Sequence, residues 1–138
     1  MLQPKKNKEL EQLLKPDILQ SKNIVIAEDD ETNFLLIKEY LEYTKANILW
    51  TKDGKETIRI VEKNNNIDLV LMDIQLPEVN GFEALRSIRR KHPKIPVVAI
   101  TAYAVSGDRE RGLKAGFNEY LAKPVSRKML LDAILKLF

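Results

Sequence analysis

The chain has 138 residues, of which 44% are hydrophobic and 31% charged, and its formal net charge is +3. This length and composition suit one domain with a substantial core, and the charge is too small to indicate nucleic-acid binding. The chain has no cysteine, which excludes disulfides and thiolate sites and is compatible with a reducing cytosol. Its apolar runs are also too short to span a membrane.

Residues 1–22 differ from the rest of the chain because lysine dominates them and two prolines bracket them. We interpret them as a linker or N-terminal arm, and residues 23–138 as the folded domain. The alternative is a short helix that Asn7 caps, Pro16 ends and a partner binds. Its apolar stripe would consist of Leu10, Leu13 and Leu14.

Short apolar runs alternate with helical patterns along the remainder of the chain. The runs predict five β-strands, at residues 23–27, 46–51, 67–73, 95–100 and 117–121. A helix is predicted after each strand: from Glu31 to about Lys45, between Gly54 and Asn64, from about Gly81, over Gly107–Ala115, and from Ser126 along an apolar stripe to Phe138. This alternation predicts a doubly wound α/β domain, in which helices cover both faces of a parallel sheet.

Basic residues crowd the end of the third predicted helix. They are Arg86, Arg89, Arg90, Lys91 and His92. Such a cluster could bind nucleic acid, but we interpret it as a solvated face whose cations suit a helix C-terminus. We assign His92 to an exposed loop.

Polar side chains follow four of the predicted strands. Glu28 and Asp29 come after the first strand, Asp73 ends the third, Thr101 follows the fourth and Lys123 follows the fifth. Because the carboxyl ends of parallel strands meet at one edge of a sheet, we expect these groups to converge there. Adjacent carboxylates repel one another unless a cation lies among them.

This set of residues suits phosphoryl chemistry with a hard cation. Carboxylate oxygens are the ligands that Mg²⁺ prefers, with Mn²⁺ as an alternative, whereas zinc is disfavoured because cysteine and a histidine pair are lacking. One carboxylate can attack phosphorus and form an aspartyl phosphate, while an ammonium and a hydroxyl neutralise the transferring oxygens. The chain has no glycine-rich nucleotide loop.

Four stretches with these side chains resemble the receiver domains of the two-component response-regulator family. They are Ile24–Asp30, Leu69–Pro77 together with Gly81, Val97–Ala102 and Glu119–Pro124. The resemblance covers roughly residues 22–138 in the family's order and spacing. The motif around Asp73 and the Glu28–Asp29 pair resemble in particular the C-terminal receivers of hybrid sensor histidine kinases.

The resemblance implies a fold and a conformational switch. The fold is flavodoxin-like, (βα)5, with strand order 2-1-3-4-5 and a cis bond between Lys123 and Pro124. Thr101 and Tyr120 match the hydroxyl and the aromatic residue that respond to phosphorylation, which alters the surface of the fourth helix, fifth strand and fifth helix. Gln75 and Tyr103 match positions that modulate loss of the phosphoryl group.

The resemblance also implies the roles of individual site residues. Asp73 matches the phosphoryl acceptor, and Lys123 and Thr101 match the residues that contact the phosphoryl group. Asp73 is also expected to bind the metal ion, which has three further implied ligands: the carboxylates of Asp29 and of Glu28, a position that is Asp in many receivers, and the main-chain carbonyl of Gln75.

The leading hypothesis is a cytoplasmic phosphoacceptor module that binds Mg²⁺ and receives its phosphoryl group from a histidine kinase or a histidine phosphotransfer protein. We expect no membrane contact by the domain itself, although a membrane sensor kinase could tether it. We expect a monomer or a weak, phosphorylation-linked dimer, and no enzymatic activity beyond self-phosphorylation and autodephosphorylation.

Two other functions fit the sequence less well. A pseudo-receiver would keep the fold as a phosphorylation-independent interaction domain, but the retained Asp73, Asp29, Thr101 and Lys123 argue against it. An aspartyl-nucleophile phosphatase would need a general acid where Gln75 stands. Because the chain ends with the last predicted helix, we expect a stand-alone regulator or a receiver excised from a larger protein such as a hybrid kinase, and we favour the latter.

Overall fold

The computed structural model describes residues 17–102 and 106–138. Its centre is one parallel sheet with the order β2-β1-β3-β4-β5, so the strand order that the resemblance implied is confirmed. The strands are β1 (Asn23–Ala27), β2 (Asn47–Thr51), β3 (Leu69–Asp73), β4 (Val97–Thr101) and β5 (Glu119–Ala122).

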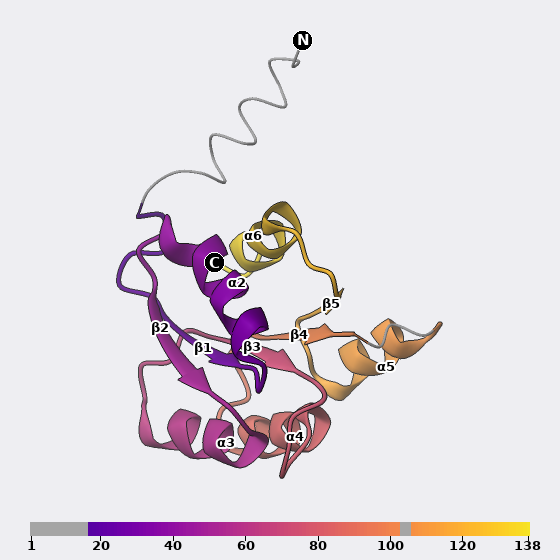
Figure 1. Cartoon of the computed structure of the whole chain (residues 1–138). Helices are drawn as coiled ribbons and strands as arrows, with labels where there is room; N and C mark the ends of the chain where they lie inside the picture. Colours follow the sequence, from indigo (N-terminus) through magenta and orange to yellow (C-terminus); the bar gives the residue numbers. More distant parts are fainter. Residues whose placement is uncertain (1–16, 103–105) are drawn as a thin grey trace.

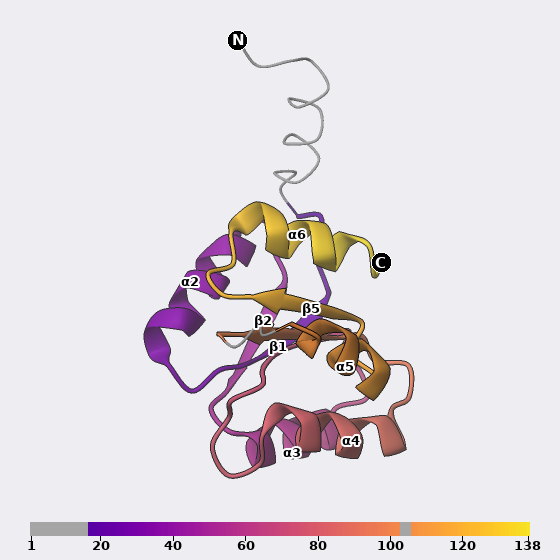
Figure 2. The ribbon, with the colours of Figure 1, turned by 90° about the vertical axis from the view of Figure 1, so that its right-hand side faces the viewer.

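Helices lie on both faces of this sheet, as the alternating pattern predicted (Figure 1). They are α2 (Glu31–Glu42), α3 (Gly54–Lys63), α4 (Gly81–Lys91), α5 (Asp108–Ala115) and α6 (Arg127–Leu135). Figures 1 and 2 both show α2 and α6 together on one face and α3 and α4 on the other, with α5 near β5.

Each face of the sheet has its own hydrophobic core, because side chains of a strand alternate between the two faces. Ile24 and Ile26 of β1 pack with α2 and α6, whereas Val25 and Ala27 pack with α3 and α4. Strands β3 and β4 are buried along their whole length. Two-sided burial explains why these strands read as continuous apolar runs.

Four helices begin at a side chain that caps the helix. The cap oxygen accepts a hydrogen bond from the main-chain amide three residues later, which satisfies one of the free N–H groups of the first turn. The cap residues are Asp30, Asp53, Asn80 and Ser126. Ser126 thus caps the helix that the sequence predicted to begin there.

Three strands begin two residues later than predicted, at Leu69, Val97 and Glu119. The preceding apolar residues, such as Ile67 and Phe117, are buried in the core without belonging to the sheet ladder. At these positions an apolar residue therefore indicated that the side chain is buried, not that the residue belongs to a strand.

Two predicted helix limits were wrong. The first helix was expected to reach about Lys45 but ends at Glu42, and Lys45 has a φ of 63°, which is incompatible with a right-handed helix. Phe138 was expected to extend the apolar stripe of the last helix. It lies beyond the end of α6 and is 49% exposed, with the ammonium of Lys22 5.1 Å from its ring centroid.

Residues 17–22 pack against the domain. The Asp17 amide donates to the Tyr43 carbonyl at 3.0 Å, and Leu19 is 1% exposed within the α2–α6 core. The possible helix from Asn7 to Leu14 lies outside the described residues. Within the described ranges no helix is long and apolar enough to cross a bilayer.

The interpretation of the basic cluster was wrong for Arg89. Its guanidinium turns inward and donates to the carbonyls of Gly116 and Ile95 and to Asn118 Oδ1. Burial lowers the pKa of this guanidinium. Arg89 therefore joins α4 to the segments before β4 and β5, a long-range role that local sequence does not reveal.

Candidate functional site

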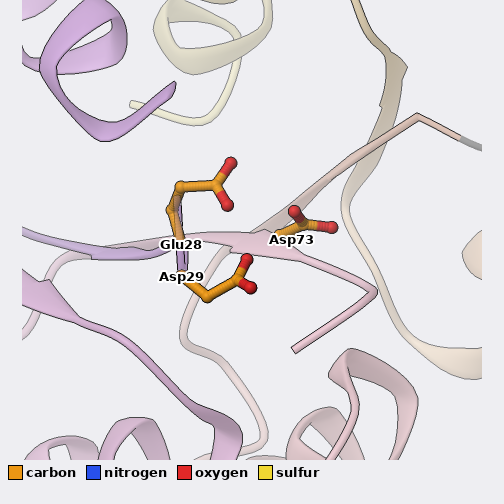
Figure 3. A group of neighbouring side chains, drawn as sticks. All are labelled: Glu28, Asp29 and Asp73. Atoms are coloured by element: carbon orange, nitrogen blue, oxygen red, sulfur yellow. The ribbon is translucent and has the colours of Figure 1, made fainter. Parts of the chain in front are cut away.

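Three carboxylates meet at the carboxyl ends of β1 and β3 (Figure 3). Glu28 and Asp29 follow β1 directly, and Asp73 is the last residue of β3. One oxygen from each group lies within 4.8 Å of the other two. Neighbouring strands bring these residues together, because Ala27 is in register with Met72.

Lys123 directly follows β5 at the same edge of the sheet and connects two of these carboxylates. Its Nζ donates to Glu28 Oε1 at 2.8 Å and to Asp73 Oδ2 at 2.9 Å. Glu28 is 2% exposed and Asp73 is buried, whereas Asp29 is exposed. One ammonium thus faces three carboxylates, so the cluster has an excess of negative charge.

The environment changes the ionisation of both Glu28 and Lys123. Burial raises the pKa of Glu28 to about 7, and the negative charge of Asp73 acts in the same direction, while Lys123 opposes the shift. Burial alone would lower the pKa of Lys123, but its hydrogen bonds to Glu28 and Asp73 outweigh that effect and raise it. Lys123 is therefore a permanent cation at neutral pH.

Main-chain contacts hold Glu28 and Asp73 in place. The Glu28 amide donates to the Thr51 carbonyl at 3.0 Å, and the Glu28 carbonyl accepts from Trp50 Nε1 at 2.7 Å. The Gln75 amide donates to Asp73 Oδ1 at 2.9 Å, which orients the carboxylate at the strand end.

Trp50 is a positioning residue that the sequence analysis missed. Its ring stacks on Phe34 with the centroids 4.1 Å apart, and the ammonium of Lys52 lies 4.6 Å from its centroid. This ring joins β2 and α2 to the carbonyl of Glu28. The sequence contained the signal only as a single tryptophan three residues before Asp53, without any indication of its partner.

The loop after β3 depends on close backbone approach at two glycines. A Cβ at Gly81 would lie 2.7 Å from the Cα of Ile74, and one at Gly54 would lie 1.7 Å from the carbonyl oxygen of Val79. Neither position has room for a side chain. The two glycines therefore let α3 and α4 begin directly against the loop that leaves Asp73.

Thr101 lies on β4, the strand next to β3, and Tyr120 lies on β5, the next strand of the sheet. Thr101 ends β4, is buried, and accepts a hydrogen bond at its carbonyl from the Lys123 amide at 2.8 Å. Tyr120 on β5 is buried against α5, where a Cβ at Gly112 would come within 2.3 Å of its ring. Burial raises the pKa of the Tyr120 phenol, partly offset by Arg111. Tyr103 lies outside the described residues.

Two further predicted features lie at the same edge. The Lys123–Pro124 peptide bond is cis, as the resemblance implied. Gln75 is exposed two residues after Asp73, in a loop beside a depression of about 530 Å³. Asp29, Pro77 and Asn80 also line this depression. The carboxylate cluster is therefore open to solvent on this side.

The donor set fits a hard divalent cation. All three side chains offer oxygen, and the exposed Asp29 leaves room for water in the coordination shell, as Mg²⁺ requires. In the described part of the chain this is the one group of three acidic or histidine side chains close enough to share an ion. Glu28, Asp29 and Asp73 are therefore the side chains that could hold a divalent cation such as Mg²⁺.

Comparisons with known proteins agree with this geometry. The family model described as the response regulator receiver domain matches residues 24–135. The chain is 35% identical over 116 residues to the polar-differentiation response regulator DivK of Brucella ovis, covering 83% of this chain and 94% of DivK. It is 36% identical over 119 residues to hybrid signal transduction histidine kinase I of Dictyostelium discoideum; this match covers 80% of the chain but spans only 7% of the kinase.

A solved receiver domain shares the fold of this chain. The receiver domain of the sensor histidine kinase PA1611 of Pseudomonas aeruginosa superposes with a TM-score of 0.77 at 34% identity, over 85% of this chain and 97% of that one. That structure has a magnesium ion coordinated in its active-site cleft. A receiver domain from Clostridium thermocellum gives a TM-score of 0.78 at 31% identity, over 84% of this chain and 93% of that one.

Proposed function

Because this chain belongs to the response regulator receiver family of two-component signalling, we propose that Asp73 accepts a phosphoryl group from a phosphohistidine. The donor would be a histidine kinase or a histidine phosphotransfer protein. The observation that carries the proposal is the Lys123 ammonium held 2.9 Å from Asp73 Oδ2, with Glu28 and Asp29 beside it.

The reaction balances with Asp73 as the nucleophile. A carboxylate oxygen of Asp73 attacks phosphorus, an O–P bond forms and the P–N bond to the donor imidazole breaks. The electron pair returns to the imidazole nitrogen, which takes up a proton. Attack of water on the acyl phosphate later releases inorganic phosphate and restores Asp73.

The residues around Asp73 would neutralise the transferring oxygens. A magnesium ion held by Glu28, Asp29, Asp73 and the Gln75 carbonyl would supply positive charge to the phosphoryl oxygens. Lys123 bonds Glu28 and Asp73 in this structure and would exchange the Asp73 contact for a phosphoryl oxygen. Thr101, at the end of the neighbouring strand, would donate its hydroxyl to another oxygen.

Phosphorylation would reach partners through the surface of α5, β5 and α6. Movement of Thr101 toward the phosphoryl group would open space beside Tyr120, whose ring now lies against Gly112 of α5. The new anion would therefore shift the balance between two packings of this surface rather than create a new fold. Thr101 and Tyr120 would make different contacts in the two packings, and this difference would couple phosphorylation of Asp73 to the surface.

The proposal is tested with the whole chain, Mg²⁺ and the small donor acetyl phosphate, followed by intact mass. We expect one added phosphoryl group that hydroxylamine removes, as an acyl phosphate requires and a serine or threonine phosphate does not. Asp73→Asn and a chelator-treated sample are expected to gain nothing.

Asp68→Asn is the matched control, because Asp68 lies before β3, at the opposite end from the site, and accepts from the Asn23 amide. It should be phosphorylated like the parent chain. Absence of an added phosphoryl group from both acetyl phosphate and a phosphorylated phosphotransfer protein would refute the proposal and favour a pseudo-receiver.

A further inference from the structure

An exposed apolar stripe runs along the outer face of α2. Leu36, Tyr40 and Tyr43 are spaced at i, i+4 and i+7, which places them on one side of a helix. Leu36 is 43% exposed and Tyr43 57% exposed, while Tyr40 is partly buried. Neighbouring apolar side chains that are exposed in this way form a surface that a further segment can cover. These three residues are called the α2 stripe below.

The α2 stripe continues into a groove that leads toward the candidate site. The groove has a volume of about 340 Å³, and its lining includes Leu36, Tyr40, Pro124 and Lys123. An occupant of the stripe would consequently lie beside Lys123, at the entrance to the carboxylate cluster.

The chain itself enters the described structure at one end of the stripe. The Asp17 amide donates to the carbonyl of Tyr43 at 3.0 Å. Leu10 precedes Asp17 by seven residues, and Leu36 precedes Tyr43 by the same number. If residues 10–16 were helical, they would rise about 10 Å, the length of the stripe from Tyr43 back to Leu36.

The sequence pattern of the N-terminal segment matches that surface. Its apolar residues recur at helical spacing, at Leu10, Leu13 and Leu14. On a helix with this spacing, Glu9 and Glu11 would border the leucine stripe, so their carboxylates would lie beside the surface that the leucines cover. The apolar periodicity of the segment therefore matches that of the α2 stripe.

Arg127 provides a second, polar indication at the same end of α2. Its guanidinium carbon lies 5.2 Å from the centroid of the Tyr43 ring. Its Nε and Nη2 atoms are buried and have no hydrogen-bond acceptor among the described residues. Buried donors of a charged group rarely lack an acceptor, and the N-terminal segment contains carboxylates at Glu9 and Glu11.

From these observations we propose that residues 7–15 pack along the α2 stripe of their own chain, with the leucines against Leu36, Tyr40 and Tyr43. A carboxylate of the segment then accepts hydrogen bonds from Arg127. The proposal does not depend on the phosphoacceptor function, since it concerns packing that exists without phosphorylation.

The proposal is tested in the full chain by paramagnetic broadening of NMR signals. The natural sequence has no cysteine, so Gln12→Cys provides one thiol for a nitroxide, on the helix side opposite the leucines. We expect selective loss of amide signals from residues 36–43 of the α2 region and from the start of α6. Signals from α3, on the other face of the sheet, should remain.

Two variants separate docking from an untethered tail. The combination Leu10→Ser, Leu13→Ser and Leu14→Ser should restore the α2 signals, whereas Leu2→Ser, the same change outside the stripe pattern, should not. Uniform broadening, no broadening, or equal broadening in the triple variant would overturn the proposal. So would broadening in a mixture of labelled untagged and unlabelled tagged protein, because that result would assign the stripe to a second copy of the chain.

Discussion

Replacing Asp29 with asparagine is expected to stabilise the metal-free protein and to remove its stabilisation by Mg²⁺. The reason is the charge imbalance at the ends of β1 and β3: Lys123 forms ion pairs with Glu28 and Asp73, whereas Asp29 has no ion pair among the described residues. The substitution keeps the shape of the side chain and deletes one of three mutually repelling charges.

The size of the effect follows from the spacing of the carboxylates. Their ligand oxygens lie within 4.8 Å of one another, and two unit charges at that distance repel by about 1 kcal/mol in a water-like dielectric. That dielectric is appropriate because Asp29 is exposed. Asp29 repels two carboxylates and is attracted by one ammonium, so the net gain in the free energy of unfolding should be about 1 kcal/mol.

Urea unfolding in the presence of a chelator measures this gain as a higher midpoint at an unchanged slope. A repeat with Mg²⁺ at one hundred times its dissociation constant should stabilise the parent chain by about 2.7 kcal/mol and the variant by much less. Asp30→Asn is the matched control, because asparagine retains the cap of α2 while the neighbouring charge is lost. It should retain the response to Mg²⁺.

Two results would refute this reasoning. A metal-free Asp29→Asn protein less stable than the parent would mean that the Asp29 carboxylate makes a favourable interaction that outweighs the repulsion. An undiminished response to Mg²⁺ would mean that the ion binds elsewhere.

Three further substitutions test contacts between segments that are distant in the sequence. Trp50→Phe removes the hydrogen bond to the Glu28 carbonyl and should lower the free energy of unfolding by about 1 kcal/mol, as measured by urea unfolding. In the parent chain, Mg²⁺ should change the fluorescence of Trp50. Gly112→Ala should cost about 1–3 kcal/mol because the new Cβ meets the Tyr120 ring, and the cost should shrink in a Tyr120→Ala background. Arg89→Lys should lower the thermal midpoint, with a loss of about 2 kcal/mol, since lysine cannot reach the several acceptors of the planar guanidinium.

The carboxylate cluster was predictable because its geometry follows from strand ends. Each of Glu28, Asp29 and Asp73 comes directly at the end of an apolar run, and parallel pairing then brings the residues together. Once β1 and β3 are neighbours, their register is enough to bring the three residues close together. The order of the strands came from the family resemblance, since alternation alone does not specify which strands are neighbours.

The features that sequence reasoning missed are contacts between distant segments. Arg89 resembled its exposed neighbours on the same helix, and only the positions of Gly116 and Asn118 show why it turns inward. Leu19 lay in a lysine-rich segment, yet it fills the core beneath α2 and α6. Local composition shows which residues are neighbours along the chain, but it does not show which residues are neighbours in the folded structure.

The carboxylate cluster also links the stability of the metal-free protein to its affinity for a divalent cation. Strands β1 and β3 lie next to each other within the sheet and are almost entirely buried, and each fully buried large aliphatic side chain contributes about 1.5–3 kcal/mol. That burial lets the fold tolerate a few kcal/mol of carboxylate repulsion at the ends of the two strands. A divalent cation relieves the same repulsion when it binds, so part of its binding free energy is stability that the metal-free protein lacks. Substitutions that neutralise Glu28 or Asp29 should therefore weaken Mg²⁺ binding most where they stabilise the metal-free chain most.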